Sequence, residues 1–150
     1  MIPFKTLDMG ALSMEIRFDA YVISDEKAKL KVETILSFLA RSYWADKRVE
    51  TAIRRSIETS HCYGVYEGEK QIAFARVVTD YATVYYLCDV FVDEAYRGQG
   101  IGKRLVDAIV NSEELKGLSG LLGTRDAHGL YEQYGFAREP EKMMRRRPVS

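Results

Sequence analysis

The pattern of apolar and polar positions predicts a chain in which strands and helices are interspersed. Apolar residues alternate with polar ones over Glu15–Ile23, which predicts a first strand. Stripes with helical spacing predict a helix over Lys29–Arg41 and a second helix from about Asp46, a residue type suited to an N-cap. The segment Ser42-Tyr43-Trp44-Ala45 separates the two helices.

Three consecutive strands are expected next. They cover Cys62–Tyr66, Gln71–Thr79 and Thr83–Val92, and Glu67–Lys70 is expected to form a hairpin turn between the first two. The third is rich in β-branched and aromatic residues, which favour strands. This succession predicts antiparallel pairing.

The last third of the chain predicts a β-α-β unit. A polar, glycine-bearing loop over Asp93–Gly102 leads into an amphipathic helix. A strand over Ser119–Thr124, a helix over Asp126–Tyr134 and an extended segment over Gly135–Arg147 follow. The whole order is β-α-α-β-β-β-α-β-α-β, which predicts an α/β fold with a mixed sheet and helices on both faces.

Composition indicates one ordinary globular domain over residues 1–150, with residues 1–14 interpreted as a loosely attached leader. The 22 basic and 22 acidic residues cancel, so overall charge gives no support for binding nucleic acid. Met1–Gly10 lacks a signal-peptide pattern, and no apolar run reaches the roughly 20 residues of a membrane span. The two cysteines form no CxxC pair, so we expect reduced thiols, a cytoplasmic location and no metal site.

Three glycines fall within five residues at 98, 100 and 102, between a strand and a helix. Glycine permits positive φ and lets a ligand approach the main chain. The start of a helix also leaves N–H groups unpaired at the positive end of its dipole. Together these features predict an anion-binding loop, flanked by Arg97 and Lys103. A tight turn without a ligand is the alternative.

Two other phosphate-binding patterns do not fit this loop. A Walker A sequence would require glycine at 97 and serine or threonine at 104, where the chain has Arg97 and Arg104. A dinucleotide fingerprint fails at Lys103 or at Leu105, depending on which glycine begins it.

The hexapeptide Arg97-Gly98-Gln99-Gly100-Ile101-Gly102 resembles the acyl-CoA pyrophosphate motif of the GCN5-related N-acetyltransferase (GNAT) family, Arg/Gln-x-x-Gly-x-Gly/Ala. Val92–Arg97 resembles the strand end that precedes this motif, and Leu130–Phe136 resembles the family's later helix-to-strand element. Because the spacing and order also match, the resemblance covers residues 15–147. It implies the GNAT acyl-CoA N-acyltransferase fold, with acetyl-CoA bound by Arg97 to Lys103.

The resemblance also implies roles for a strand and a tyrosine. Main-chain N–H groups of Leu87–Val92, around Val90 and Phe91, would meet the thioester carbonyl. Tyr131 matches the family's acid, since a phenol with a pKa of about 10 stays protonated at neutral pH; a packing role is the alternative. Thr124 stands where members often carry an asparagine that contacts the pantetheine arm.

Asp89 is the candidate general base. A carboxylate inside the apolar run Tyr85–Val92 must be paired or functional, and burial would raise its pKa into a useful range. The alternative is a structural carboxylate bonded to a nearby tyrosine or arginine. Arg76 is either such a partner or a contact for a substrate carboxylate.

Three further residues are candidates for contacting the acceptor. Tyr43 and Trp44, at the helix break, would form an aromatic wall for an amine, or else pack the helices onto the sheet. His128 lies three residues before Tyr131, on the same side of the predicted helix, and would relay a proton or contact substrate. A surface histidine is the alternative.

The interpretation of the whole chain is an N-acetyltransferase that acts on a primary amine, expected to be a small molecule because no acidic run would recruit a basic peptide. A protein or peptide amine is an alternative acceptor. A non-catalytic acyl-CoA-binding regulatory module is another alternative, against which the retained Tyr131 argues. No nucleic-acid or membrane partner is expected, and a homodimer through exposed final strands stays open.

Overall fold

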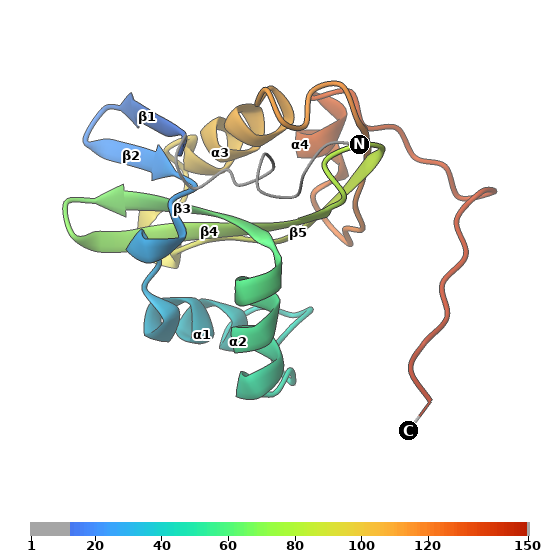
Figure 1. The fold of residues 1–150 in the computed structure, drawn as a ribbon, viewed down its shortest axis with the longest axis horizontal. Helices are drawn as coiled ribbons and strands as arrows, with labels where there is room; N and C mark the ends of the chain where they lie inside the picture. Colours follow the sequence, from blue (N-terminus) through green and yellow to red (C-terminus); the bar gives the residue numbers. More distant parts are fainter. Residues whose placement is uncertain (1–12, 150) are drawn as a thin grey trace, which may run out of the picture.

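A computed structural model describes residues 13–149, so the leader expected over residues 1–14 lies almost entirely outside the described residues. The described residues form one curved six-stranded sheet whose strands lie in chain order (Figure 1). The strands are β1 (Glu15–Phe18), β2 (Tyr21–Ser24), β3 (His61–Glu67), β4 (Lys70–Thr79), β5 (Val84–Val92) and β6 (Ser119–Leu121). Neighbouring strands are antiparallel except for the parallel pair β5–β6.

Helices cover both faces of this sheet. In residues 13–149 these are α1 (Val32–Ala40), α2 (Glu50–Thr59), α3 (Ile101–Val110) and α4 (His128–Glu132), with short 3-10 turns η3 (Lys27–Lys29) and η4 (Glu94–Tyr96). Helices α1 and α2 lie on one side of the sheet, and α3 and α4 lie on the other (Figure 1). The mixed α/β class with helices on both faces of the sheet, predicted from the sequence, is confirmed.

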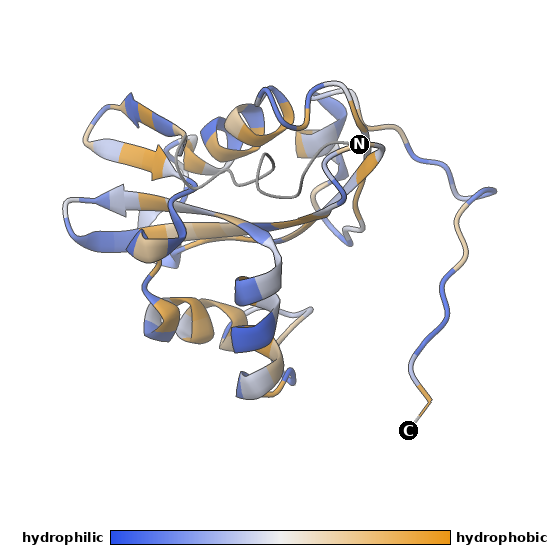
Figure 2. Cartoon of the chain, viewed as in Figure 1, coloured by the Kyte–Doolittle hydropathy of each residue, from blue (hydrophilic) through white to orange (hydrophobic). Residues whose placement is uncertain are grey.

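Each face of the sheet buries its own apolar core. Leu105 and Ile109 of α3 pack with Val65 and Ile72 of the central strands, whereas Phe38 of α1 belongs to the core on the opposite face. Figure 2 shows that helices carry both apolar and polar sides, while the tip of the β3–β4 hairpin is polar. The hydrophobic effect therefore fixes both helical layers on the sheet.

Two predicted elements differ in the structure. The single strand expected over Glu15–Ile23 is a hairpin, because Asp19 adopts a φ of 51° and the chain reverses so that Phe18 pairs with Tyr21. The final extended segment expected over Gly135–Arg147 joins no strand of the described sheet. Its residues from 137 onward are exposed and run away from the body of the molecule (Figure 1).

The second helix also begins later than predicted. Its first residue is Glu50 and its N-cap is Val49, so Asp46 is not the cap. The residues between the two helices instead form turns, with the N–H of Arg48 donating to the carbonyl of Ala45 at 3.0 Å. This longer connection carries the aromatic pair and Arg48.

A β-bulge in β5 changes which of its side chains face each core. Two residues, Asp89 and Val90, face the single residue Ala75 of β4. Asp89 has a φ of 55°, a left-handed conformation that aspartate tolerates better than most residues. Leu87, before the bulge, lies in the α3-side core, whereas Phe91, after it, lies in the α1-side core.

Strands β5 and β6 pair over a short length only. Val84–Tyr86 pairs with Ser119–Leu121, where β6 ends. The edge of β5 from Leu87 to Val92 that faces away from β4 therefore has no strand partner among the described residues. Ligands of α/β proteins commonly bind beyond the carboxyl ends of parallel strands, and this open edge is such a place.

Candidate active site

The glycine loop after β5 presents a series of unpaired main-chain donors. The first hydrogen bond of α3 runs from the N–H of Arg104 to the carbonyl of Gly100 at 3.0 Å. Within residues 13–149, the six N–H groups of residues 98 to 103 donate no hydrogen bond. Gly98 and Gly100 have φ values of 82° and 80°, and a Cβ at either would meet nothing within 4 Å. These donors, at the positive end of α3, form a cradle for an anion.

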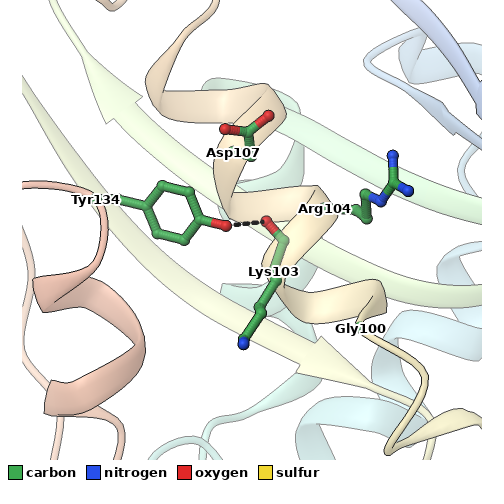
Figure 3. Close-up of a pocket in the computed structure, with 5 residues that line it drawn as sticks. All are labelled: Gly100, Lys103, Arg104, Asp107 and Tyr134. Carbon is green, nitrogen blue, oxygen red and sulfur yellow. Dashed lines mark hydrogen bonds between the residues drawn. The ribbon is translucent and has the colours of Figure 1, made fainter.

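Two tyrosines from other elements hold this loop in place. The Tyr21 hydroxyl of β2 donates to Oε1 of Gln99 at 2.7 Å. The Tyr134 hydroxyl, just beyond α4, donates to the carbonyl oxygen of Lys103 at 3.0 Å (Figure 3). The loop is therefore shaped by the fold rather than by a ligand.

Three cations surround the cradle. The exposed side chains of Lys103 and Arg104 line a shallow pocket against the first turns of α3 (Figure 3). Arg97 lies over the ring of Phe91, with its guanidinium carbon 5.0 Å from the ring centre, and donates through Nε to the carbonyl of Val92 at 2.8 Å. Asp107, which lines the same pocket, is the one carboxylate between residues 97 and 107, so the local charge is positive although the net charge of the chain is zero.

The pairing of β5 determines which of its N–H groups face the open edge. The N–H of Asp93 donates to the carbonyl of Ile72 at 2.8 Å, toward β4. Because strand N–H groups alternate between edges, the N–H of Val92 points away from β4 and that of Phe91 points toward it. Val90, two residues before Val92, shares its edge. Of the predicted donors, Val90 and Val92 are thus suited to meet a ligand, and Phe91 is not.

Tyr131 of α4 combines burial with a free hydroxyl. Its side chain is largely buried and packs edge-on against Phe136, with ring centres 6.0 Å apart. Burial raises the pKa of Tyr131 to about 12, and the nearby Tyr43 and Asp126 act in the same direction. No described residue accepts from or donates to its hydroxyl. Tyr131 is therefore a neutral potential proton donor that also contributes to the core.

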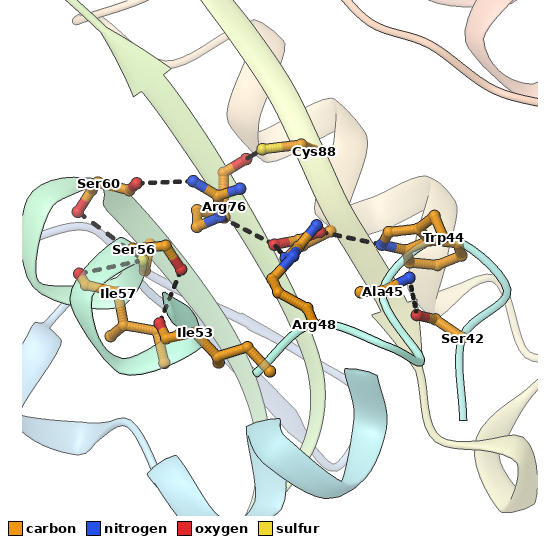
Figure 4. A network of polar contacts seen from close by, with 12 residues as sticks. Ser42, Trp44, Ala45, Arg48, Ile53, Ser56, Ile57, Ser60, Arg76 and Cys88 are labelled. Atoms are coloured by element: carbon orange, nitrogen blue, oxygen red, sulfur yellow. Dashed lines mark hydrogen bonds and ion pairs between the residues drawn. The ribbon is translucent and has the colours of Figure 1, made fainter. Parts of the chain in front are cut away.

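Asp89 is fully engaged by three donors. Its Oδ2 accepts from Nε of Arg76 at 2.8 Å and from Nη1 of Arg48 at 2.9 Å, while Oδ1 accepts from Nε1 of Trp44 at 2.9 Å (Figure 4). Burial alone would raise the pKa of Asp89, but hydrogen bonds from the two arginines and their charges outweigh it, so the pKa is lowered.

The expectation of a raised pKa at Asp89 is therefore wrong. The reason is that two guanidinium groups stabilise the carboxylate more than desolvation destabilises it. A side chain that is 1% exposed and has both oxygens occupied is poorly placed to take a proton from an amine. The alternative interpretation of Arg76, as the partner of Asp89, is the one that the structure contains.

The predicted aromatic wall lies between two segments that are distant in sequence. Tyr43 and Trp44 meet edge to face, with ring centres 5.0 Å apart, and are 41% and 39% exposed. The Tyr43 hydroxyl accepts from the N–H of Arg125 at 3.1 Å, and the Arg125 guanidinium lies 3.8 Å from the Tyr43 ring centre. The connection between α1 and α2 is thereby joined to the segment between β6 and α4.

His128 and Thr124 lie near the start of α4. His128 is its first residue, is half-buried, and has no hydrogen-bond partner for its ring within the described range. The Thr124 hydroxyl accepts from the N–H of Ala127 at 3.0 Å. Thr124 thus stabilises the turn into α4 and keeps only its own O–H to offer a ligand.

Sequence reasoning did not identify Arg48 and Arg125. Arg48 contacts Asp89 across 41 residues of sequence, and Arg125 contacts Tyr43 across 82. The one signal for Arg48 was its place four residues after Trp44, and no such signal marked Arg125 as a partner of Tyr43.

Two kinds of feature are absent from the described residues. In residues 13–149, no three His, Cys, Asp or Glu side chains are grouped so that they could hold a metal ion. None of the helices in that range has the length and apolar character needed to cross a membrane.

Comparison with known proteins identifies the family. The profile of the acetyltransferase (GNAT) domain matches residues 58–138, more than half of the chain. A structure from Xanthomonas campestris pv. campestris, assigned to GNAT acetyltransferases, is 38% identical, with a TM-score of 0.82 over 88% of this chain and 96% of that one. A Clostridium acetobutylicum acetyltransferase structure with acetyl-CoA shares the fold at 17% identity, with a TM-score of 0.62 over 89% and 96% of the chains.

A curated relative is considerably longer. The match to Histone acetyltransferase TAP1 of Glycine max is 31% identical over 88 residues, and covers 57% of this chain but only 38% of that protein. The family profile and the nearly full-length match to the Xanthomonas structure show that this chain belongs to the GNAT acetyltransferase family.

Proposed function

We propose that this chain transfers the acetyl group of acetyl-CoA directly to a primary amine. The observation that carries the proposal is the series of six unpaired N–H groups over residues 98 to 103, beside the open edge of β5. The Clostridium protein of the same fold, solved with acetyl-CoA, supports this choice of donor.

The residues present fit acetyl-CoA. At Gly98 and Gly100 the space that a Cβ would take is open, so a diphosphate can approach the main chain. Residues 98 to 103 would hold the diphosphate, with Arg97 and Lys103 adding charge. The open-edge N–H groups of Val90 and Val92 would donate to carbonyl oxygens of the arm and the acyl group. Acetyl-CoA bound there supplies an acyl group activated as a thioester.

Tyr131 is the proposed general acid. Transfer forms a C–N bond and breaks a C–S bond, so the leaving thiolate gains one proton and the amine loses one. The Tyr131 hydroxyl is neutral throughout the physiological pH range and can supply the proton that the thiolate gains. Since Asp89 is held by three donors, the second proton passes to solvent at the exposed mouth formed by Tyr43 and Trp44.

The two cysteines do not favour a covalent acetyl-enzyme. Burial raises the pKa of Cys88 to about 11 and that of Cys62 to about 12. Both are thiols at neutral pH, and the thiolate is the nucleophilic form. Attack by an amine held next to the acyl group needs no such intermediate.

We infer that the acceptor is a small molecule. The wall formed by Tyr43, Trp44 and Arg125 offers apolar and cationic contacts over the area of only three side chains, which suits a small ligand. A protein amine is the second candidate, favoured by the histone acetyltransferase name of the soybean relative.

Thiol release from acetyl-CoA over a panel of amines tests the proposal. The expected result is that at least one amine raises the rate above hydrolysis and that Tyr131→Phe lowers this rate. A chain that binds CoA in equilibrium dialysis but accelerates no amine would be a binding module, and the proposed transfer would be wrong.

A further inference from the structure

The acceptor side of the site contains more positive charge than its buried carboxylate balances. Asp89 is paired with both Arg76 and Arg48 through a single oxygen, Oδ2. Arg76 also donates through Nη1 to the Ser60 hydroxyl at 3.1 Å, and its side chain is only 14% exposed. One carboxylate therefore faces two guanidinium groups. The more buried of them, Arg76, is held by hydrogen bonds within the protein.

Arg48 has hydrogen-bond donors that the described residues do not use. Its Nη1 contacts Asp89, but its Nε and Nη2 have no hydrogen-bond partner in the part of the chain that the structure describes. Its side chain is 30% exposed, so solvent or a ligand reaches it. A guanidinium edge with two parallel donors matches the two oxygens of a carboxylate.

A second accessible cation lies across the aromatic pair. Arg125 stacks on Tyr43 and forms no ion pair within residues 13–149. Tyr43 contacts Trp44, and Trp44 donates to the same Asp89 that Arg48 contacts. The exposed aromatic pair is thus bordered by guanidinium groups on two sides.

The position of Arg48 relates this charge to the acyl group. Asp89 immediately precedes Val90, whose N–H is a proposed donor to the acyl carbonyl. Nη1 of Arg48 is 2.9 Å from Oδ2 of Asp89, so Arg48 contacts the residue that adjoins this donor along β5.

We infer that the acceptor is a primary amine that also carries a carboxylate, and that Arg48 binds this carboxylate. The inference rests on the proposed acetyl transfer and specifies its substrate class. Arg48 thereby determines specificity and positions the acceptor, while the reaction uses the groups already described. The same cations favour the neutral form of a bound amine, which is the nucleophilic form.

Matched acceptors provide the first test. We would measure kcat/KM for thiol release with glycine, alanine and phenylalanine, each as the free amino acid and as its α-amide. The amides have less basic amines, so a preference for the acids cannot come from a larger neutral fraction. We expect the best acid to be favoured over its amide by about tenfold or more.

Variants test whether Arg48 causes the preference for acids over amides. Arg48→Gln is expected to lower kcat/KM for the acid about tenfold more than for the amide, chiefly through KM, and Arg48→Lys to retain part of the preference. Arg55→Gln is the matched control, since Arg55 is exposed on α2 and its side chain forms no hydrogen bond or ion pair with a described residue. An enzyme that turns over amides as well as acids would overturn the inference and leave the proposed transfer intact.

A binding measurement tests the same inference without turnover. Trp44 is the only tryptophan, and its indole N–H donates to Asp89, so the protein gives one indole signal in a nitrogen-15 NMR spectrum. N-acetylphenylalanine should shift this signal at a lower concentration than N-acetylphenylalaninamide, and Arg48→Gln should remove the difference. The spectrum also reports whether the variant is folded. Equal responses to acid and amide in the wild type would overturn the inference even if no amine is acetylated.

Discussion

At the scale of single residues, burial has different consequences for Tyr131 and Asp89. No cation among residues 13–149 opposes the burial of the Tyr131 phenol, so desolvation raises its pKa to about 12 and keeps it neutral. The Asp89 carboxyl is more deeply buried, yet Arg76 and Arg48 lower its pKa and keep it charged. The first group is suited to donate a proton, and the second is suited to orient arginines.

Tyr131→Phe tests the proposed acid. We expect kcat for thiol release to fall roughly 100-fold or more, since general acids contribute about that much, while the dissociation constant for acetyl-CoA changes little. Because the pKa of Tyr131 is raised to about 12, the wild-type rate should show no alkaline loss through Tyr131 up to about pH 10. Stopped assays of thiol release across pH would check both. Unchanged kcat would exclude Tyr131 as the acid.

Asp89→Asn tests the buried ion pairs. Asparagine tolerates positive φ, so the main effect is the loss of charge beside two arginines, with an expected loss of about 3–5 kcal/mol in unfolding free energy. The folded pKa lies below the ordinary 3.8, so the part of this stabilisation that depends on the ionised carboxylate is fully present above that value and is lost as the pH falls through the folded pKa.

Urea unfolding at several pH values measures this effect. The difference between wild type and Asp89→Asn should be constant near neutrality and should shrink under acid conditions. Asp46→Asn is the control, since Asp46 is exposed and its side chain has no partner in the described range. A cost no larger than that of the control would contradict the assigned role.

The sequence pointed to Tyr131 and Asp89 but not to the arginine that lowers the pKa of Asp89. Tyr131 was identified through the resemblance of Leu130–Phe136 to an element of the family, and Asp89 because a carboxylate in an apolar run is unusual locally. The sign of the pKa shift at Asp89 depends on Arg48, which is far away in sequence. Such contacts are determined by the folded chain and leave no local pattern.

At the scale of elements, a two-residue alternation predicts strands well but does not locate their irregularities. Both arms of the first hairpin continue the same alternation, so the reversal at Asp19 was not visible in the pattern. The bulge in β5 was equally hidden, because Asp89 reads as one polar residue in a strand. The loop after β5 was predicted correctly, since its glycines are required by the backbone itself.

Gly100→Ala tests that requirement. Its φ of 80° disfavours any Cβ, so we expect a loss of about 1–2 kcal/mol in unfolding free energy and at least about tenfold weaker acetyl-CoA binding. Gly117→Ala is the control, because Gly117 is exposed, has no positive φ and has open space at its Cβ. Calorimetric titration should separate the two variants. Equal affinities would mean that the loop does not hold the diphosphate.

At the scale of the whole molecule, the two halves of the site come from different parts of the chain. The proposed acceptor wall lies between α1 and α2, and the proposed donor cradle lies at the start of α3, on opposite faces of the sheet (Figure 1). Strand β5 lies between them. Its bulge residue Asp89 accepts from Trp44 and Arg48 of the proposed wall, and its end leads into the loop that forms the cradle. This division explains why the donor half was evident from a motif and the acceptor half was not.

The segment beyond Arg138 should contribute little to this architecture. Its ordered contacts are local, such as Lys142 with Glu139 at 3.7 Å. A chain ending at Arg138 is therefore expected to keep its thermal midpoint within about 2 °C and its affinity for acetyl-CoA. Differential scanning calorimetry checks this expectation. A large drop in the midpoint would show that the segment packs on this or another copy of the chain.

The most direct measurement of the central claim is mass spectrometry of both protein and acceptor after mixing with carbonyl-labelled acetyl-CoA. Direct transfer predicts that the label appears in an amide of the acceptor, in step with thiol release, while the protein mass stays unchanged. An acetylated protein that forms first and then passes the label on would contradict direct transfer. Absence of any labelled amide across the amine panel, with acetyl-CoA bound, would contradict the assignment of acetyltransferase activity.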